Sequence, residues 1–268
     1  MTRLPALPLP PWLILFARFG YVAKGLVLLI VGIYIAELAV GQSRAPKDVQ
    51  GVLFDLATEP FGRLLVLGIS LGLFGYTLWL FARGLFDADQ QGRKPMALLR
   101  RASCLLSGLT YGALGCFAAS VVAGEGTAPT EAATRGWTAL LLQSEAGWWV
   151  VMLAGAVGVV LAVNQFVVAG TGMFLQFTPL SGRHRYLRRG VRLLGQLGIL
   201  VRGGLFLVVG WLFLQAGWRH DAHLAGGLQK ALMVLGDPPL GLWVLGLVAL
   251  GFMAMGLYSL IQTRYRLI

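Results

Sequence analysis

Five basic or polar residues recur at matching places in three long apolar stretches of the sequence. They are Arg18, Lys24, Arg101, Gln196 and Arg202. If these stretches are membrane helices that face one another, the five side chains ring the inner mouth of a helix bundle, with Lys24 and Arg202 deeper than the rest. Such a ring suits a phosphate, a carboxylate or a lipid headgroup, as basic pockets between helices do. The alternative is that these long side chains only extend to the membrane interface and set the orientation of the helices.

Two neighbouring amides, Asn164 and Gln165, stand deep in another apolar stretch. Polar groups inside a membrane are costly unless they are paired. Hydrogen bonds between helices are one explanation, and contact with a solute is the other.

The remaining polar residues predict little chemistry. Cys104 and Cys116 are twelve residues apart in one expected helix, about 18 Å at the helical rise, so they cannot pair with each other. His220, Asp221 and His223 share a loop, where such residues are most often solvated. No nucleophile triad and no phosphate-binding glycine loop is recognisable. We therefore expect no metal, no cofactor and no enzymatic activity.

The elements that hold these residues are membrane helices. The chain is 57% hydrophobic and only 12% charged, whereas soluble domains contain roughly a quarter charged residues. A span needs about 20 mainly apolar residues. Six stretches meet this requirement, near residues 13–40, 64–86, 98–123, 148–172, 191–217 and 240–261.

A threefold repeat relates the six spans. The first span of each pair carries two glycines seven residues apart and polar residues at fixed distances before them: Arg18, Lys24, Gly25 and Gly32; Arg101, Ser107, Gly108 and Gly115; Gln196, Arg202, Gly203 and Gly210. Residues seven apart share one face of a helix. We interpret the six glycines as helix-packing residues, because small residues let membrane helices approach closely; a glycine-lined cavity or a hinge is the alternative.

The repeat also predicts the domain organisation. An N-terminal tail of residues 1–11 precedes three two-helix repeats at 12–90, 91–178 and 179–268. In each repeat, the loop between the two spans has apolar residues at three- and four-residue steps, which indicates a short amphipathic helix. These residues are Val49, Val52, Leu53 and Leu56; Trp137, Leu140 and Leu141; and Leu224, Leu228, Ala231, Leu232 and Leu235. We expect these helices to lie flat in the outer interface.

The charges predict the orientation. Short loops rich in Lys and Arg stay in the cytoplasm. With both termini and the links 87–97 and 173–190 inside, each counted with its flanking helix ends, the charge is +14 inside and −3 outside, which accounts for the net charge of +11. We therefore expect a multi-pass protein of the cytoplasmic (inner) membrane with both termini in the cytoplasm. The basic balance follows from this topology and predicts no nucleic-acid partner.

Three motifs resemble a known bacterial family. They are Ala17-Arg18-x-Gly20-Tyr21-x-Ala23-Lys24-Gly25, Glu59-Pro60-Phe61-Gly62-Arg63 and Gly75-Tyr76-x-x-Trp79. They look like the membrane family catalogued as Domain of Unknown Function 1206, which is similarly built from three tandem two-helix repeats. Repeats two and three depart from it, with Ser107 and Arg202 at the lysine position. The resemblance implies the architecture and no particular activity.

The predicted fold is an all-α transmembrane bundle of six helices, built from three parallel two-helix repeats in a pseudo-threefold arrangement. Parallel repeats of this kind occur in transporters. One hypothesis is a carrier or channel-like protein that handles a small anion or an amphiphile through its basic cytoplasmic mouth. The other is a structural or lipid-binding subunit that packs against membrane lipids, a membrane-protein partner or a second copy of itself.

Overall fold

The computed structural model describes residues 11–41, 45–86, 95–126, 132–144, 146–177, 185–237 and 240–265. Residues 1–10 of the expected tail, and residues 87–94 and 178–184 of the two links expected inside, lie outside this part. Every regular element in the described residues is a helix. The α-helices are α1 (Pro11–Ala39), α2 (Val49–Thr58), α3 (Gly62–Phe86), α4 (Pro95–Ala123), α5 (Ala132–Leu142), α6 (Gly147–Thr171), α7 (Arg185–Arg219), α8 (Leu228–Leu235) and α9 (Gly241–Tyr265). Two short 3₁₀ helices, η1 (Met173–Phe177) and η2 (Ala222–Leu224), flank α7.

Six of these helices, α1, α3, α4, α6, α7 and α9, are long and apolar enough to cross a membrane. This confirms the six spans that hydropathy predicts. The three short helices α2, α5 and α8 lie in the loops where the sequence predicts amphipathic helices. Their position at the outer membrane interface stays a prediction.

A glycine begins each of the three helices that follow a short helix. A carbon atom added at Gly62 or Gly147 would collide with the backbone of the preceding short helix, at Leu56 or Leu141, and one added at Gly241 would collide with Gly236, the residue that follows α8. Only glycine leaves room for so close an approach of two backbones. The link glycines in the sequence therefore fold each short helix tightly against the start of the next span.

The chain forms two compact units. Unit 1 comprises Met1–Val27, Leu53–Thr127 and Ser259–Ile268, and unit 2 comprises Leu28–Val52 and Ala128–Tyr258. The borders fall within α1, α2 and α9, so the units differ from the three repeats. The repeat boundaries stay a prediction of the sequence.

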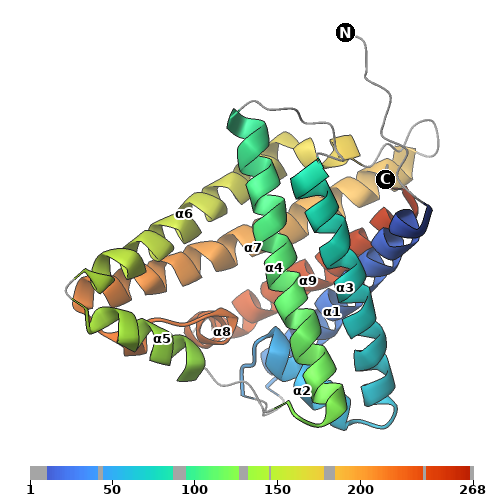
Figure 1. Ribbon diagram of the computed structural model, residues 1–268. Coiled ribbons are helices and arrows are strands. Elements are labelled where there is room, and N and C mark those ends of the chain that lie inside the picture. The colour runs from blue at the N-terminus through green and yellow to red at the C-terminus, as the bar shows by residue number, and fades with distance from the viewer. Residues whose placement is uncertain are drawn as a thin grey trace. The chain divides into compact units, whose positions relative to one another are not determined.

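In unit 1, α3 and α4 run side by side along most of their length (Figure 1). The buried hydroxyl of Ser70 on α3 donates a hydrogen bond to the carbonyl oxygen of Gly115 on α4, at 2.9 Å. This bond satisfies a polar group that would be costly in lipid.

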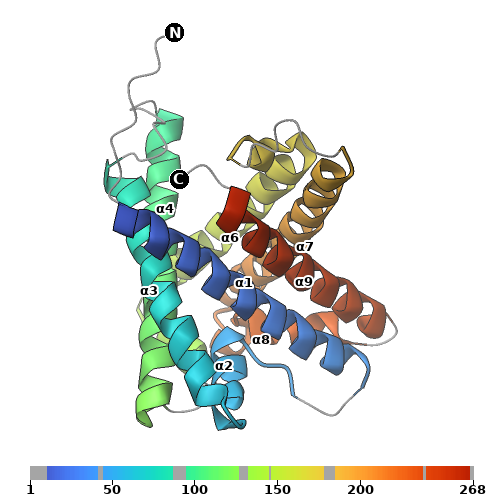
Figure 2. The ribbon, with the colours of Figure 1, turned by 90° about the vertical axis from the view of Figure 1, so that its right-hand side faces the viewer.

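In unit 2, α6 and α7 form the corresponding pair, and Figure 2 shows them from a second direction. Their backbones approach closely at Gly210 of α7. A carbon added there would lie 2.9 Å from both the carbonyl oxygen of Gly155 and the amide nitrogen of Val159. Van der Waals contact at small residues is the main source of helix association in lipid, so this crossing holds the pair together.

Helix contacts repeat between the first and third pairs of spans. In each pair, two glycines bring the helices together at the same two levels. The matched contacts are Gly20 with Tyr76 and Gly198 with Met255 at one level, and Gly72 with Ala23 and Gly251 with Val201 at the other. The internal repeat of the sequence is thus accompanied by a repeat of the packing.

Candidate functional site

The ammonium group of Lys24 lies among aromatic side chains of neighbouring helices. Lys24 is on α1 and is 9% exposed. Its Nζ donates a hydrogen bond to the hydroxyl oxygen of Tyr76 on α3, at 3.2 Å. Nζ also lies 5.1 Å from the ring centroid of Tyr76 and 5.7 Å from that of Tyr111 on α4. A cation within about 6 Å of a ring centroid is attracted to the ring, so both tyrosines hold the charge.

Two more aromatic residues complete this site, which we name the Lys24 cluster: Lys24, Tyr21, Tyr76, Trp79 and Tyr111. The ring of Tyr76 meets those of Tyr21 and Tyr111 edge to face, at centroid distances of 5.1 and 4.9 Å. Trp79 is 1% exposed and packs in the same buried group. Its indole Nε1 has no hydrogen-bond partner among the described residues.

The close approach of α1 and α3 places these side chains. A carbon added at Gly20 would lie 2.6 Å from the Cα and the amide nitrogen of Tyr76. With glycine there, the start of Tyr76 sits directly against α1, and its ring reaches Lys24 one turn further along. A larger residue at position 20 would move Tyr76 away from the ammonium group.

The Lys24 cluster lies well inside a candidate span. Lys24 is ten residues from the start of the span Ile14–Ala39, a distance of about 15 Å at the helical rise. The hydrocarbon layer is about 30 Å thick, so the cation is closer to the middle of the span than to its end. Ionisable residues at such depth are rare and usually functional.

Sequence reasoning found only part of this site. Lys24 stood out as a deep cation, and Gly75-Tyr76-x-x-Trp79 stood out as a family motif, but nothing assigned Tyr76 and Trp79 to Lys24. The i, i+3 spacing of Tyr76 and Trp79 was the available signal, because it puts both on one face of α3. Tyr111 gave no signal, since its place depends on how α4 packs.

Arg101 and Gln196, which hold equivalent positions in repeats two and three, bond to the ends of the preceding spans. Arg101 donates from Nε to the carbonyl oxygen of Gly84 at 2.8 Å and from Nη2 to that of Leu85 at 2.7 Å. Gln196 donates from Nε2 to the carbonyl oxygen of Ala169 at 3.0 Å. The last carbonyl groups of a helix lack partners within the helix and carry partial negative charge. Both residues therefore stabilise a helix end.

Arg18 and Arg202 behave differently. Arg18 is exposed and forms no hydrogen bond or ion pair with a described residue. Arg202 is half-buried, and its guanidinium carbon lies 5.2 Å from the ring centroid of Phe206, one turn along α7. The predicted ring of five divides between the units, with Gln196 and Arg202 in unit 2 and the others in unit 1. A single inner mouth stays a prediction.

The amides of the fourth span do not form the expected interhelical hydrogen bonds within the described residues. Asn164 is exposed on α6, and Gln165 is half-buried. The carbon chain of Gln165 packs instead against Gly203 of α7, where an added carbon would lie 3.2 Å from its Cβ. The position of the two amides in the sequence places them within the span, but it does not show which side of the helix each one faces.

The glycine stripes of the second and third repeats contact the span that precedes them in the chain. Carbons added at Gly108 and Gly115 would lie 3.4 Å from side chains of α3, an ordinary contact, whereas Gly203 and Gly210 lie closer to α6. Gly32 lies against α9, where an added carbon would be 2.7 Å from Cγ of Met253. Gly25 is buried. These contacts differ from stripes that face one another, because spacing shows which residues share a face and not which helix that face meets.

The structure describes both cysteines and the histidines at positions 220 and 223. Cys104 is half-buried beside the Lys24 cluster, and Cys116 is exposed. Among the described residues, no three His, Cys, Asp or Glu side chains are grouped so that they could hold a metal ion. The absence of a metal and of a cofactor from the protein's function stays a prediction.

The fold and the family match together show what kind of protein this chain is. Six long apolar helices in an all-helical structure make it a multi-pass membrane protein. A model of the family described as Domain of Unknown Function (DUF1206) matches residues 19–87, 102–172 and 197–266, one segment for each repeat. The chain therefore belongs to this family, as its motifs indicated.

A relative from Bacillus subtilis (strain 168), described as uncharacterized protein YxxB, is similar to this chain along nearly its whole length. It is 29% identical over 256 residues, which cover 96% of this chain and 92% of the relative. No solved structure matches the chain.

Proposed function

We propose that the Lys24 cluster binds the anionic group of a small anion or an amphiphile, and that the protein carries this ligand across the bacterial cytoplasmic membrane. The observation that supports this most directly is the ammonium group of Lys24. Lys24 is nearly buried inside a candidate membrane span, and its ammonium group contacts a phenol hydroxyl and two aromatic rings.

The composition of the cluster favours an anion as the ligand. An ammonium group and an indole N–H only donate hydrogen bonds. The Trp79 N–H is buried and has no acceptor among the described residues, and such a group costs about 1 to 3 kcal/mol. A carboxylate or phosphate supplies several acceptor oxygens and forms strong bonds with charged donors. A ligand of this class would accept a hydrogen bond from the Trp79 N–H and would carry a charge opposite to that of Lys24.

We infer the finer architecture together with this function. The three repeats surround an axis along the membrane normal, the short helices lie at the outer interface, and both termini are cytoplasmic. Three observations support the arrangement: the matched contacts in the first and third pairs of spans, the equivalent bonds of Arg101 and Gln196, and the excess of basic residues on one side. The proposal involves no enzymatic reaction, cofactor or nucleic-acid partner.

Ligand uptake by proteoliposomes tests this function. Oleate, dodecyl phosphate and inorganic phosphate represent the carboxylate, the amphiphilic phosphate and the free anion. Lys24→Met keeps the length of the side chain but removes the charge, so we expect binding and uptake of the preferred anion to fall by about tenfold or more, the value of one charged hydrogen bond. Arg192→Met is the matched control, because Arg192 is an exposed cation of α7 outside the cluster.

Equal uptake by the wild-type protein and by Lys24→Met, with both variants folded, would contradict the proposed site. If the protein binds the anion in a Lys24-dependent way but shows no uptake, the proposed transport is rejected and the proposed binding site is retained. Uptake of a cation in preference to all three anions would reject the ligand class.

A second function, a structural or lipid-binding subunit of a membrane complex, has its own support. Arg101 and Gln196 are engaged in holding helix ends, and Gly210 packs against backbone. These residues serve packing rather than a ligand. Gentle extraction followed by native mass spectrometry separates the two functions: a stable complex with another membrane protein or a second copy favours the subunit, whereas a lipid-free monomer argues against it.

A further inference from the structure

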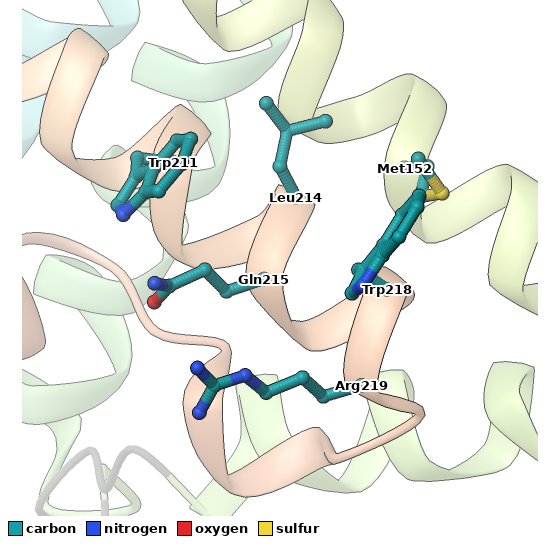
Figure 3. Close-up of a pocket in the computed structure, with 6 residues that line it drawn as sticks. All are labelled: Met152, Trp211, Leu214, Gln215, Trp218 and Arg219. Atoms are coloured by element: carbon teal, nitrogen blue, oxygen red, sulfur yellow. The ribbon is translucent and has the colours of Figure 1, made fainter.

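A groove of about 400 Å³ lies along α7 in unit 2, at the end of the helix opposite to Arg188 and Arg192. It is lined by Met152 of α6 and by Trp211, Leu214, Gln215, Trp218 and Arg219 of α7 (Figure 3). The residues of α7 are three, four and seven apart, so they form one face of the helix. The groove is therefore a continuous strip of a single helix with one wall from its neighbour.

This strip ends at the limit of a membrane span. Arg219 is the last residue of the candidate span Arg188–Arg219, and Trp211 and Trp218 are 58% and 76% exposed. Tryptophan is enriched where the hydrocarbon layer meets the headgroups. Nearby, Trp148 stacks on Trp149 at 4.1 Å and lies 5.7 Å from the ring of His220, which extends the aromatic surface at this end. The Arg219 end of the groove thus belongs at the interface and its apolar part in the hydrocarbon.

The polar end of the groove carries one positive charge. Arg219 is exposed and forms no hydrogen bond or ion pair with a described residue. Figure 3 shows that the side chains of Gln215 and Arg219 extend from α7 in the same direction. A guanidinium group binds phosphate through paired N–H donors, and the Gln215 amide adds a donor one turn deeper.

The length of the strip matches one leaflet. From Trp211 to Arg219 the helix rises about 12 Å, and half of the hydrocarbon layer is about 15 Å. An acyl chain that begins at the level of Gln215 can therefore lie against Trp211, Leu214 and Met152. A soluble anion would use Arg219 alone and leave the apolar part of the groove uncovered.

We propose that this groove binds one phospholipid, with its phosphate on Arg219, a glycerol ester carbonyl on Gln215 and an acyl chain against Trp211 and Leu214. This site is independent of the Lys24 cluster, which belongs to the other unit. It assigns a specific lipid to the membrane face of α7.

Native mass spectrometry of the protein released from phosphatidylglycerol nanodiscs tests the site. We expect the wild-type protein to retain one lipid, and Arg219→Gln to retain about fivefold less, the value of one arginine near an anionic headgroup. Arg63→Gln is the matched control, because Arg63 is an exposed arginine in the first turn of α3. It makes the same chemical change and should retain the lipid.

The apolar half of the site is tested separately. Trp211→Ala should also lower lipid retention, whereas Trp243→Ala, at a tryptophan of α9 that is 75% exposed, should not. All four variants change exposed side chains, and unchanged melting temperatures in detergent will show that they are folded.

Three results would overturn the proposal. Equal retention by Arg219→Gln and Arg63→Gln would show that lipid binding does not use the groove. Binding of inorganic phosphate that depends on Arg219, without lipid, would show a site for a free anion. A lipid-free dimer that is lost in Trp211→Ala would show that a second copy of the chain covers this face.

Discussion

Arg101, Gln196 and Arg18 hold equivalent positions in the three repeats, but only the first two have partners in the described residues. Arg101 bonds to Gly84 and Leu85, and Gln196 bonds to Ala169, in each case at the end of the span just before it in the chain. Arg18 lies on α1, the first of the described helices, and is exposed. The same position therefore stabilises a helix end in two repeats and leaves an exposed cation in the first.

This difference predicts unequal effects of alanine at two matched arginines. Arg101→Ala removes two charge-assisted bonds to helix-end carbonyls, and we expect it to lower the free energy of unfolding by about 2 kcal/mol. Arg18→Ala removes a side chain without a described partner, and surface changes of this kind stay within about 0.5 kcal/mol. Reversible unfolding in mixed micelles measures both values.

The Arg101 result is specific to its hydrogen bonds. Arg101→Lys keeps the charge but cannot make the same pair of bonds, so its stability should lie between the wild-type protein and Arg101→Ala. Equal stability of Arg18→Ala and Arg101→Ala would contradict the assignment of Arg101 to the end of α3.

Sequence reasoning at this scale located the unusual residues but not their partners. A cation deep in an apolar stretch is visible in the sequence, and Lys24 was found in this way. The partner of each polar group depends on which helix lies beside it, and this was not visible for Arg101 or Tyr111. The sequence predicts that Arg101 belongs to an anion-binding ring. The hydrogen bonds of Arg101 support a structural role at the end of α3 instead.

At the scale of the helices, hydropathy predicted the six spans well because length and apolar composition are local properties. The bounds of α3 differ from the predicted 64–86 by two residues at one end. The neighbours of each helix were less predictable. Seven-residue spacing identified the glycine stripes, but α4 packs its stripe on α3, and α7 packs its stripe on α6.

Alanine substitutions at two glycines of α7 distinguish the effect of helix packing from the effect of helix propensity. A carbon at Gly210 would meet backbone atoms of α6 at 2.9 Å, whereas nothing lies within 4 Å of a carbon at Gly204. Backbone cannot rotate away, so we expect Gly210→Ala to separate the helices and cost about 1 to 3 kcal/mol. Gly204→Ala should be neutral or slightly stabilising, because alanine favours the helix by about 1 kcal/mol.

Thermal unfolding of the two variants in the same detergent compares them directly. Gly108→Ala is a further comparison, since its added carbon would make only ordinary contact with side chains of α3. If Gly204→Ala proves as destabilising as Gly210→Ala, the loss comes from the helix itself and not from the contact with α6.

In the molecule as a whole, the first and last spans are in contact although they are far apart in the chain. Gly115 on α4 and Gly210 on α7 each contact the span before them, α3 and α6. The equivalent glycine of the first repeat, Gly32 on α1, contacts Met253 on α9. The glycine of the first repeat thus contacts the last span, α9, instead of the span before it in the chain.

A disulfide between α1 and α9 tests this contact between the two helices. A carbon at Gly32 lies 2.7 Å from Cγ of Met253, and cysteine at position 253 replaces this atom by sulfur. In a disulfide the two β-carbons lie about 3.5 to 4.5 Å apart, and each sulfur lies closer than that to the opposite β-carbon. In a background without Cys104 and Cys116, we expect Gly32→Cys with Met253→Cys to form the bond under mild oxidation, seen as a faster-migrating band that a reductant removes.

The control for the disulfide is Gly32→Cys with Leu250→Cys, because Leu250 is an exposed residue of α9 that is 59% accessible. This pair should stay reduced within one molecule. A bond that forms at equal rates in both pairs would indicate random collision, and no bond in either would place α9 away from Gly32. Either result would contradict the contact between Gly32 of α1 and Met253 of α9.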